Sequence, residues 1–548
     1  MNRRQLLKTG ALGAAGLAMS PLSGWKSVYA HRKQEHVLRP YPHPLTPVFD
    51  TAYATDVHGD AFAPLPVTDR GVALSPGVTD RPFAVNGRHF VEGFGNVWLE
   101  ADNAGQMFTP GDDGASGILN VEFARTRVHR NGEQLARYQA DGTQFSTEVR
   151  HLHDLSSALL EDALRAEGAR AADLADRSLL HGLWAGEKIE LEKARSDIQR
   201  MNRQDAFYFG CETRHYVWAK SIDFEKRFPE VFNYGTITHY VYDTWYEVFE
   251  PREGEYRWGI KDNIVDWMKD HDMTIEGRPL FWFHPWVTPV WLAEKNFEEL
   301  KDYVVRHTNA LVGHYGDDIL HWEVVNEYHD WANVHNHTPE QITEIVRLAC
   351  ETTHDVNPRV ERQINNCCTF GSYAAWGHDA GGEADRPLRT PRKFMQDIVE
   401  AEVPFEVLGL QMYFPQRCIS DIVRLVERFV EFGKPISITE IGTSSGPTRE
   451  DILTGSSIPA APYDWHRPWD DDLQADWLEQ LYTVFYSKPY INNVNWYDFA
   501  DIRTFIPTGG VVQEDGTPKA SFHRLKDLLE SWGRLPEPNV RYPESLVE

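Results

Sequence analysis

The sequence contains little cysteine, fewer basic than acidic residues and almost no long apolar run. The 548 residues include five cysteines, an odd number and too few for a disulfide scaffold, so we expect buried free thiols. Lysine and arginine number 55 against 82 aspartate and glutamate residues, for a formal net charge of −27. This surplus of negative charge would repel nucleic acids and anionic membranes, so neither is an expected partner.

The long apolar runs are confined to the first thirty residues. A basic start with Arg3-Arg4 precedes an apolar run over residues 11–19, and Val28-Tyr29-Ala30 is a small-residue cleavage site. This pattern is typical of an export signal, and the arginine pair indicates the twin-arginine type. No other stretch of about 18 residues is uninterrupted and apolar, so no membrane-spanning segment is expected in the mature chain. We therefore predict a periplasmic or secreted protein.

The region after the signal is predicted to form a small accessory domain. Residues 31–154 are expected to be β-rich and sandwich-like, and residues 155–204 form a helical connector rich in Ala, Leu, Glu and Arg. The local signals are strand-like runs at Phe90–Leu99 and Ile118–Val128 and hairpin turns at Asn86-Gly87, Asn131-Gly132 and Asp141-Gly142. A sandwich carries no function by itself, so sugar binding and simple packing on the next domain remain equally open.

Residues 205–535 alternate short apolar runs with amphipathic helical patterns, which indicates an α/β fold of parallel βα units. The strand candidates are residues 207–212, 234–239, 274–283, 321–327, 362–368, 405–414, 435–441 and 492–499. The helical patterns lie at residues 262–270, 297–314, 339–354, 391–400, 421–432, 473–486 and 520–532. Eight such units predict a (β/α)8 TIM barrel, followed by a tail over residues 536–548.

Two glutamates end apolar strand candidates of this barrel. Glu327 follows Trp322-Glu323-Val324-Val325-Asn326, and Glu440 follows Ile436-Ser437-Ile438-Thr439. The reactive groups of such barrels lie at the carboxyl ends of the strands, and a buried carboxylate is costly without a purpose or a partner. Each glutamate alone fits a salt bridge at a strand end. Together they fit glycoside hydrolysis, in which one carboxyl group protonates the leaving oxygen and the other attacks or activates water.

Aromatic residues gather near the same strand ends. The chain has 18 tryptophans. Those on or beside the predicted strand ends, with one tyrosine, are Trp282, Trp286, Trp291, Trp322, Trp496 and Tyr497. Flat aromatic faces can stack on sugar rings, although core packing is the commoner role of a single aromatic residue in a barrel.

These motifs resemble those of the family 10 glycoside hydrolases, chiefly endo-1,4-β-xylanases. The resemblance covers about residues 207–532, and its most specific part is Trp322–Glu327, which is similar to the acid/base motif of that family. The other similar segments, in the order of the family, are Phe232-Asn233 with Trp245 and Glu250-Pro251; Leu280–His284 with Pro289 and Trp291; Ile438-Thr439-Glu440; and Trp496, Asp501 and Asp515–Ala520.

The resemblance implies roles for individual residues. It makes Glu327 the general acid/base and Glu440 the nucleophile, with retention of anomeric configuration. It implies that Asn326 binds the sugar 2-hydroxyl and that Gln411 orients these groups. The remaining implied substrate-binding residues are His284, Tyr413, Trp291 and Trp496. A core histidine bonded to the backbone is the alternative for His284.

Several positions depart from the family pattern. Residues 240–244 read Tyr-Val-Tyr-Asp-Thr where the family has a Glu-Asn-x-x-Lys grip on the sugar. Tyr413 replaces a histidine that contacts the nucleophile, and Gly442 stands in place of an aspartate. Tyr413 retains a hydroxyl that can donate to Glu440.

The predicted function is that of a retaining, endo-acting β-glycanase on xylan or a related hemicellulose, with a polysaccharide or oligosaccharide substrate. The alternatives are a retaining glycosidase of the same barrel superclass on another β-linked glycan, and a non-catalytic carbohydrate-binding protein. No cofactor is expected. The polar loop at residues 328–337 contains His and Asp but lacks a recognisable metal-ligand spacing, so no metal is expected, and contacts at the substrate rim or a solvated loop are the alternatives.

Overall fold

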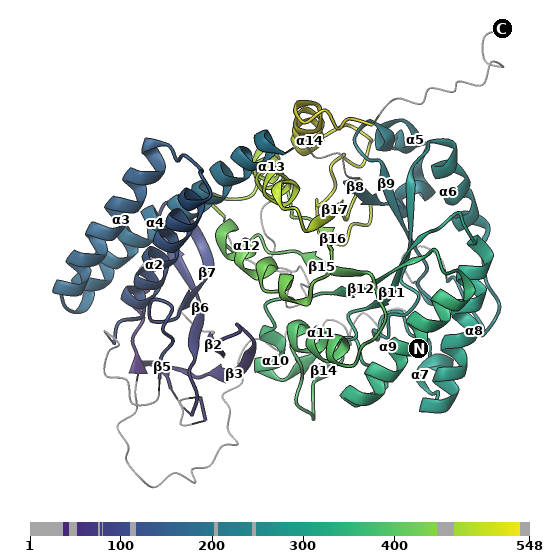
Figure 1. The fold of residues 1–548 in the computed structure, drawn as a ribbon, viewed down its shortest axis with the longest axis horizontal. Coiled ribbons are helices and arrows are strands. Elements are labelled where there is room, and N and C mark those ends of the chain that lie inside the picture. Colours follow the sequence, from purple (N-terminus) through teal and green to yellow (C-terminus); the bar gives the residue numbers. More distant parts are fainter. Residues whose placement is uncertain are drawn as a thin grey trace.

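The computed structural model describes residues 37–42, 52–74, 77–78, 80–109, 117–201, 207–243, 248–446 and 465–536. The predicted export signal, Trp245 and all but the first residue of the predicted C-terminal tail lie outside these ranges. Figure 1 shows the sheets and helices that precede residue 202 on one side of a barrel formed by the rest of the chain.

The first part contains two small antiparallel sheets, which confirms a β-rich region ahead of the barrel. The four-stranded sheet has the order β3 (Ala61–Leu65), β2 (Ala52–Thr55), β6 (Ala84–Val91) and β7 (Gly95–Ala101). The three-stranded sheet has the order β1 (Val37–Leu38), β5 (Gly71–Ala73) and β4 (Val67–Thr68). Asn86-Gly87 lies within β6, so its prediction as a hairpin turn is wrong.

Three long helices complete this part: α2 (Leu119–Ala140), α3 (Thr147–Arg165) and α4 (Gly168–Arg200). The prediction of a strand at Ile118–Val128 and of a turn at Asn131-Gly132 is therefore wrong, and the helical layer begins at residue 119 rather than 155. Asp141-Gly142 does form a turn, but the turn joins α2 to α3. The helices share one apolar core with both sheets, so the sheets bury their apolar faces against helices as well.

The second part is the predicted closed barrel of eight parallel strands. In barrel order the strands are β8 (Tyr208–Glu212), β9 (Tyr234–Thr238), β10 (Thr274–Arg278), β11 (His321–Asn326), β12 (Glu361–Asn366), β15 (Val407–Met412), β16 (Ile436–Ile441) and β17 (Ile491–Trp496). Strand β17 pairs with β8 and closes the ring. The eight predicted strands are confirmed, although β10 ends earlier than expected because Pro279 has no backbone N–H to donate.

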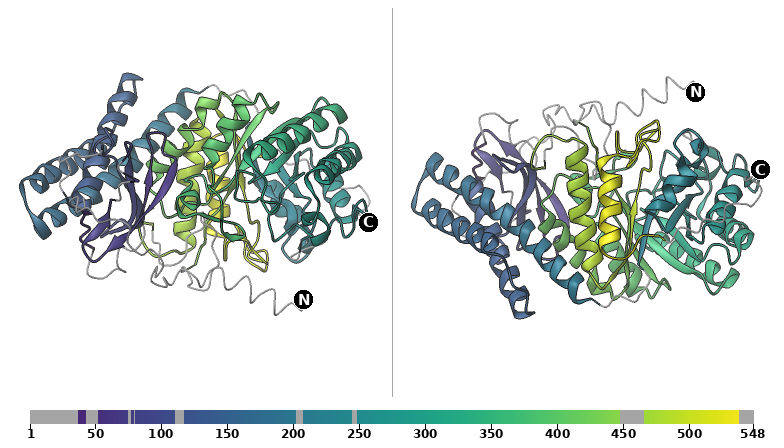
Figure 2. Two further views of the ribbon diagram at one scale, coloured as in Figure 1. Left: turned by 90° about the horizontal axis from the view of Figure 1, so that it is seen from below. Right: turned by 90° about the horizontal axis from the view of Figure 1, so that it is seen from above.

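In the part of the chain that the structure describes, seven helices of nine or more residues surround the barrel and agree with the predicted helical patterns. They are α6 (Gly259–Asp270), α8 (Phe297–Tyr315), α9 (Pro339–Val356), α11 (Pro391–Glu400), α12 (Ile419–Glu427), α13 (Asp471–Ser487) and α14 (Ala520–Ser531). Capping boxes begin α8, through Asn296 and Glu299, and α9, through Thr338 and Gln341. Figure 2 shows α13 and α14 beside the C-terminal end of α4.

Shorter elements fill the connections. Strand β8 is followed by η2 (Thr213–Trp218), α5 (Phe224–Arg227) and η3 (Phe228–Glu230) instead of one long helix. The others are α7 (Val290–Ala293), α10 (Ser372–Trp376), β13 (His378–Asp379), β14 (Gly382–Glu383) and η4 (Val430–Phe432).

Buried polar contacts fix the first part to the barrel beside α12. Arg127 of α2 pairs with Asp421 at 2.6 Å. Asp60, which precedes β3, pairs with Arg392 of α11 at 2.9 Å. Arg417, in the loop after β15, donates to the Tyr53 hydroxyl at 2.9 Å. The first part therefore packs on the barrel next to the loop that follows Gln411 and Tyr413.

All five cysteines are buried and free, which confirms the prediction of reduced core thiols. Within the described ranges, no helix has both the length and the apolar character needed to cross a membrane.

Candidate active site

Glu327 and Glu440 lie at the same end of the barrel. Glu327 directly follows β11, and Glu440 is the fifth of the six residues of β16. The strands are parallel, so their carboxyl ends meet on one face. Strand β15 lies between β12 and β16, and its residue Gln411 pairs in register with Glu440.

Three contacts hold Glu327 in a buried position. Trp282 donates its indole N–H to Oε2 at 2.8 Å, and Gln411 donates to Oε1 at 2.8 Å. The backbone N–H of Glu327 donates to the Asn365 carbonyl at 2.9 Å, and its φ of 57° turns the chain sharply after the strand. Burial and the negative charge of Glu440 raise the pKa of Glu327 to about 7. Glu327 can therefore carry a proton near neutral pH.

Glu440 is held by different donors. Arg278, the last residue of β10, forms a buried ion pair and hydrogen bond with Oε1. Tyr413 donates its hydroxyl to Oε2 at 2.7 Å, and Asn365 lies 3.4 Å from Oε1. The two glutamates thus differ in their donors: Glu327 accepts from two neutral side chains, whereas Glu440 accepts from a cation and a hydroxyl group.

Asn326 and Gln411 belong to a network of amides beside the two glutamates, and their predicted roles toward the substrate stay predictions. The Asn326 Oδ1 atom accepts from Gln411 at 3.3 Å and from Asn365 at 3.2 Å. Asn365 also donates to the buried Glu323 at 2.9 Å. These amides form a connected network around Glu327 and Glu440.

A row of rings leads outward from Glu327. Trp282 lies 4.9 Å from the Tyr240 ring and 4.7 Å from the His284 ring, measured between centroids. His284 lies 4.7 Å from Trp286, which is 58% exposed. Burial lowers the pKa of His284 to about 3, so its ring is neutral, and its Nδ1 accepts from the Trp286 backbone N–H at 3.1 Å. The substrate-binding role of His284 stays a prediction. The contact with the Trp286 backbone is of the kind expected for the alternative, a core histidine bonded to the backbone.

Trp496 does not face the site. Its ring is fully buried, packs near Trp477 and donates its N–H to the Gly509 carbonyl at 2.9 Å. The prediction that Trp496 binds substrate is therefore wrong, because alternate residues of a strand point to opposite faces. The next residue, Tyr497, lies 5.9 Å from the Tyr413 ring and 3.4 Å from the Tyr240 hydroxyl.

Trp291 is half-buried in the connection after β10. It packs edge to face on Tyr303 of α8 at 5.6 Å and lies 5.8 Å from the Lys295 ammonium. These contacts hold the ring against the outer helical layer, so a role in substrate binding stays a prediction.

The polar loop after β11 begins with buried residues that bond both within the loop and to later segments of the barrel. Tyr328 bonds His337 at 2.8 Å, His329 bonds Tyr373 at 2.7 Å, and Asp330 pairs with Arg389 at 2.9 Å. A solvated loop was one of the two alternatives for this segment, and it is wrong for Tyr328, His329 and Asp330, which are buried. Among the described residues, no group of three or more His, Cys, Asp or Glu side chains is arranged to hold a metal ion.

Sequence reasoning missed Arg278 and Asn365, which both contact Glu440. Arg278 ends β10, but the strand sequence Thr-Ile-Glu-Gly-Arg is not apolar and the strand candidate at residues 274–283 placed Arg278 inside it, so the signal that identified Glu327 and Glu440 was absent. Asn365 lies inside β12, where Asn365-Asn366 interrupts the apolar pattern. Neither position belongs to a motif of the resemblance.

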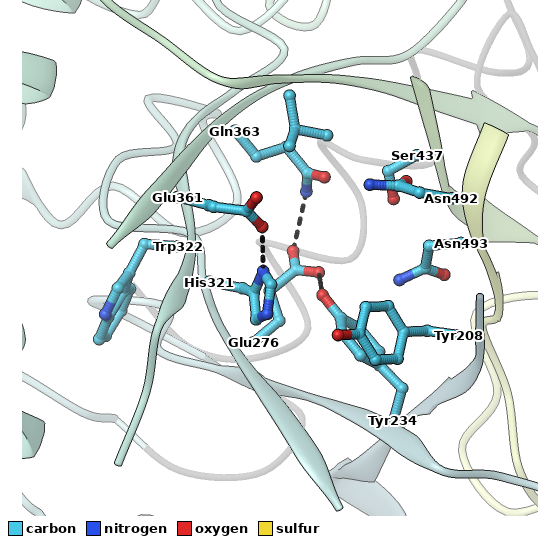
Figure 3. Close-up of a pocket in the computed structure, with 11 residues that line it drawn as sticks. Tyr208, Tyr234, Glu276, His321, Trp322, Glu361, Gln363, Ser437, Asn492 and Asn493 are labelled. Atoms are coloured by element: carbon cyan, nitrogen blue, oxygen red, sulfur yellow. Dashed lines mark hydrogen bonds and ion pairs between the residues drawn. The ribbon is translucent and has the colours of Figure 1, made fainter. Parts of the chain in front are cut away.

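A small hollow lies at the opposite end of the barrel, among residues that begin the strands (Figure 3). Its lining includes Tyr208, Tyr234 and His321, the first residues of their strands, and Glu276, whose carboxylate accepts from Gln363 at 2.9 Å. It encloses about 20 Å³, room for about one water molecule and far too little for a sugar ring. The candidate active site is therefore at the carboxyl end.

Comparison with known proteins gives matches over the barrel. The sequence profile described as "Glycosyl hydrolase family 10" matches residues 198–527, more than half of the chain. Endo-1,4-beta-xylanase A of Halalkalibacterium halodurans is 24% identical over 287 residues, which cover 47% of this chain and 66% of that protein. Endo-1,4-beta-xylanase 2 of Claviceps purpurea is 28% identical over 125 residues, 22% of this chain and 38% of that protein. The chain thus spans just under two thirds of the first relative and less of the second.

One similar solved structure is that of xylanase 10B from Thermotoga petrophila in complex with xylobiose. It has a TM-score of 0.44 and 19% identity, over 62% of this chain and 97% of that chain.

Proposed function

Because the chain belongs to glycosyl hydrolase family 10, we propose that it is a retaining, endo-acting β-glycanase that hydrolyses xylan or a related hemicellulose. The observation that carries the proposal is the contrast between its two glutamates. The pKa of Glu327 is raised to about 7, while Glu440 accepts from Arg278 and Tyr413. An acid that can keep its proton near neutral pH, next to a second carboxyl group bound by a cationic donor, is the arrangement that this mechanism requires.

In the proposed mechanism, Glu440 attacks the anomeric carbon while Glu327 gives its proton to the departing glycosidic oxygen. The bond from the anomeric carbon to that oxygen breaks, and an ester between the sugar and Glu440 forms. Glu327, now ionised, takes a proton from water, which displaces Glu440 and restores both groups. The two inversions leave the anomeric configuration unchanged.

Two observations support a short gap between the carboxyl groups, as retention requires. The charge of Glu440 acts on Glu327, and Gln411 bonds Glu327 from the strand position paired with Glu440. Retaining enzymes separate the two carboxyl groups by about 5–5.5 Å, which leaves no room for a water between them.

The test is hydrolysis of xylan followed by proton NMR of the first product. We expect reducing ends that appear first in the β configuration and a fall in viscosity that precedes the bulk release of reducing sugar. Glu440→Ala should remove this activity. Hydrolysis that survives Glu440→Ala, or a first product in the α configuration, would overturn the proposed mechanism.

A second candidate is the same chemistry on a different β-linked glycan. It is favoured by Tyr240, whose ring packs on Trp282 and whose hydroxyl lies 3.4 Å from that of Tyr497. This residue occupies the segment where the family pattern has its sugar grip. Parallel assays on xylan, mannan, β-glucan and arabinogalactan separate the two candidates, because each predicts a different preferred polymer.

The proposed location is the periplasm or the exterior of the cell, and it depends on the first thirty residues alone. Replacing Arg3-Arg4 by a lysine pair should leave the protein in the cytoplasmic fraction if export is of the twin-arginine type. Unchanged export of that variant would contradict this route.

A further inference from the structure

Arg278 faces carboxylates from three other barrel strands. It ends β10 and is 1% exposed. Its Nη2 atom bonds Glu440 of β16, and its Nε lies 3.3 Å from Oε2 of Glu323 in β11. Its Nη1 lies 3.9 Å from Oε2 of Glu212 in β8. One guanidinium group thus lies beside three buried carboxyl groups.

The same carboxylates also accept from neutral donors. Glu212 accepts from Thr236 and Thr238 of β9 at 3.0 and 2.7 Å. Glu323 accepts from Asn365, and Glu440 from Tyr413. These donors stabilise the carboxylates but add no positive charge, so the charge balance of the cluster depends on Arg278.

Besides Tyr413, which donates to Glu440, a second tyrosine lies near Arg278. The Tyr497 ring lies 5.7 Å from the guanidinium carbon of Arg278, and its hydroxyl is 3.4 Å from that of Tyr240. Although burial lowers it, Glu323 and Glu440 raise the pKa of Arg278 well above its usual value. Arg278 is therefore a cation at neutral pH.

We propose that Arg278 is a positioning residue that keeps Glu440 ionised in the free enzyme and passes its ion pair to Glu323 when Glu440 becomes an ester. The proposal rests on the proposed function. Burial by itself would favour the neutral, unreactive form of Glu440, and a fixed guanidinium opposes this effect. The fork of Arg278 already reaches both Glu440 and Glu323, so this shift of the ion pair needs no large movement.

The charges balance through the step. The new bond joins a Glu440 oxygen to the anomeric carbon, the bond to the leaving oxygen breaks, and Glu327 supplies the proton to that oxygen. The negative charge disappears from Glu440 and appears on Glu327. Arg278 then loses Glu440 as its anionic partner. Burial raises the pKa of Glu323 well above its usual value, and the charge of Glu440 adds to this rise, so the loss of that charge favours an ionised Glu323 beside Arg278.

The first test measures Glu440 directly and does not depend on activity. Protein labelled with ¹³C at the glutamate carboxyl carbons is titrated by NMR, and the Glu440 signal is assigned from Glu440→Gln. We expect Arg278→Gln to raise the pKa of Glu440 by about one unit or more, and Arg278→Lys to raise it less because the charge is kept. An unchanged pKa in Arg278→Gln would overturn the proposal. If Arg278→Gln does not fold, Arg278→Lys decides, and no rise there would also overturn it.

The second test uses the pH profile of kcat/KM on the glycan that the wild type hydrolyses best. The acid limb of Arg278→Gln should move upward by about one pH unit, so that the variant loses more activity at low pH than at pH 7, with a limit of about tenfold well below the midpoint. Arg278→Lys should lie between this variant and the wild type. An equal loss at every pH would indicate a purely structural role and overturn the proposal. A wild type that hydrolyses no glycan would instead refute the proposed function. The NMR titration would still test whether Arg278 affects the pKa of Glu440.

The third test concerns Glu323. With 2,4-dinitrophenyl β-xylobioside as the probe, Glu323→Gln leaves Arg278 without its second partner in the ester, so the ester should form more slowly and break down faster. We expect the burst of dinitrophenol to fall at least twofold. Glu187→Gln is the control, since it removes a buried carboxylate of α4, outside the barrel, and should keep the burst. A full burst in Glu323→Gln would contradict the shift of the ion pair.

Discussion

Gln411 donates a hydrogen bond of 2.8 Å to Glu327, although its own strand position pairs with Glu440. The amide therefore connects the surroundings of the two carboxyl groups. Gln411 and Trp282 favour the ionised form of Glu327, whereas burial and the charge of Glu440 oppose it more strongly. This balance places the pKa of Glu327 at about 7 and gives the site a defined pH response.

We expect activity to fall as the pH rises through about 7. Glu327 must be protonated to act as an acid, and above its pKa of about 7 it has lost that proton. The basic limb of kcat/KM should therefore have its midpoint near pH 7. The profile is measured on the preferred polysaccharide between pH 4 and 10. Activity that stays flat from pH 6 to 9 would contradict this assignment.

Glu327→Gln should affect substrates according to their leaving groups. Hydrolysis of the polysaccharide should fall by about 10²- to 10⁴-fold, because a sugar hydroxyl leaves poorly without a proton. Dinitrophenyl glycosides need little protonation, so formation of the glycosyl-enzyme should slow far less. The comparison uses kcat/KM on both substrates with one enzyme preparation. Equal losses on the two would show that Glu327 is not the acid.

The donors to Glu327 provide a way to move this pH response. Gln411→Met and Trp282→Phe each remove one hydrogen bond that lowers the pKa of Glu327, so each should raise that pKa and shift the basic limb upward by about one pH unit. Trp286→Phe, which changes an exposed indole of the same ring row, should leave the limb in place. A downward shift in Gln411→Met would mean that this amide does not act on Glu327 as a donor.

The barrel could be predicted because its strands are short apolar runs separated by helical patterns of ordinary length. All eight strands were identified, and the misplaced end of β10 reflects Pro279, after which Phe281 pairs with Val325 only through an isolated bridge. Glu327 and Glu440 were found because charged residues rarely end such strands. The same reasoning did not reach Arg278, because the strand candidate at residues 274–283 placed it inside a strand rather than at a strand end.

The first helical layer was mispredicted for a tertiary reason. The inward face of α2 includes Arg127 and Arg130, which are buried because they pair with Asp421 and Asp102. Polar residues at these positions hide the helical period of the apolar ones, so the start of α2 looked like a strand. The prediction for Trp496 was wrong for a similar reason, since only the strand register decides whether Trp496 or its neighbour Tyr497 faces inward.

Trp286 is predicted to bind a sugar ring beyond the residues that contact the cleaved bond. It is 58% exposed and is joined through His284 and Trp282 to Glu327. Trp286→Ala should raise KM for long oligosaccharides about three- to tenfold, from the loss of one aromatic contact, and leave short ones unaffected. Val290→Ala, which changes a 70% exposed residue of the same connection, is the control. An equal effect on all chain lengths would contradict a distant contact.

The attachment of the first part to the barrel should depend on buried rather than exposed ion pairs. Arg127 and Arg137 both lie on α2 and both pair with the α12 segment, Arg127 with Asp421 at 2.6 Å and Arg137 with Glu427 at 3.3 Å. The first pair is buried, whereas Arg137 is half exposed. Arg127→Ala should destabilise the protein by about 3–5 kcal/mol, because it leaves a buried carboxylate without its main partner.

Arg137→Ala should cost about 1 kcal/mol or less, because water screens that pair. Thermal and urea unfolding of the two variants, followed by circular dichroism, gives the comparison. If the first part were an independent module, Arg127→Ala would release it in an early transition and leave the barrel melting unchanged. We expect the barrel transition itself to move down, since Asp421 belongs to α12 of the barrel and its buried carboxylate loses Arg127 as a partner. Equal midpoints for the two variants would show that the buried pair does not hold the parts together.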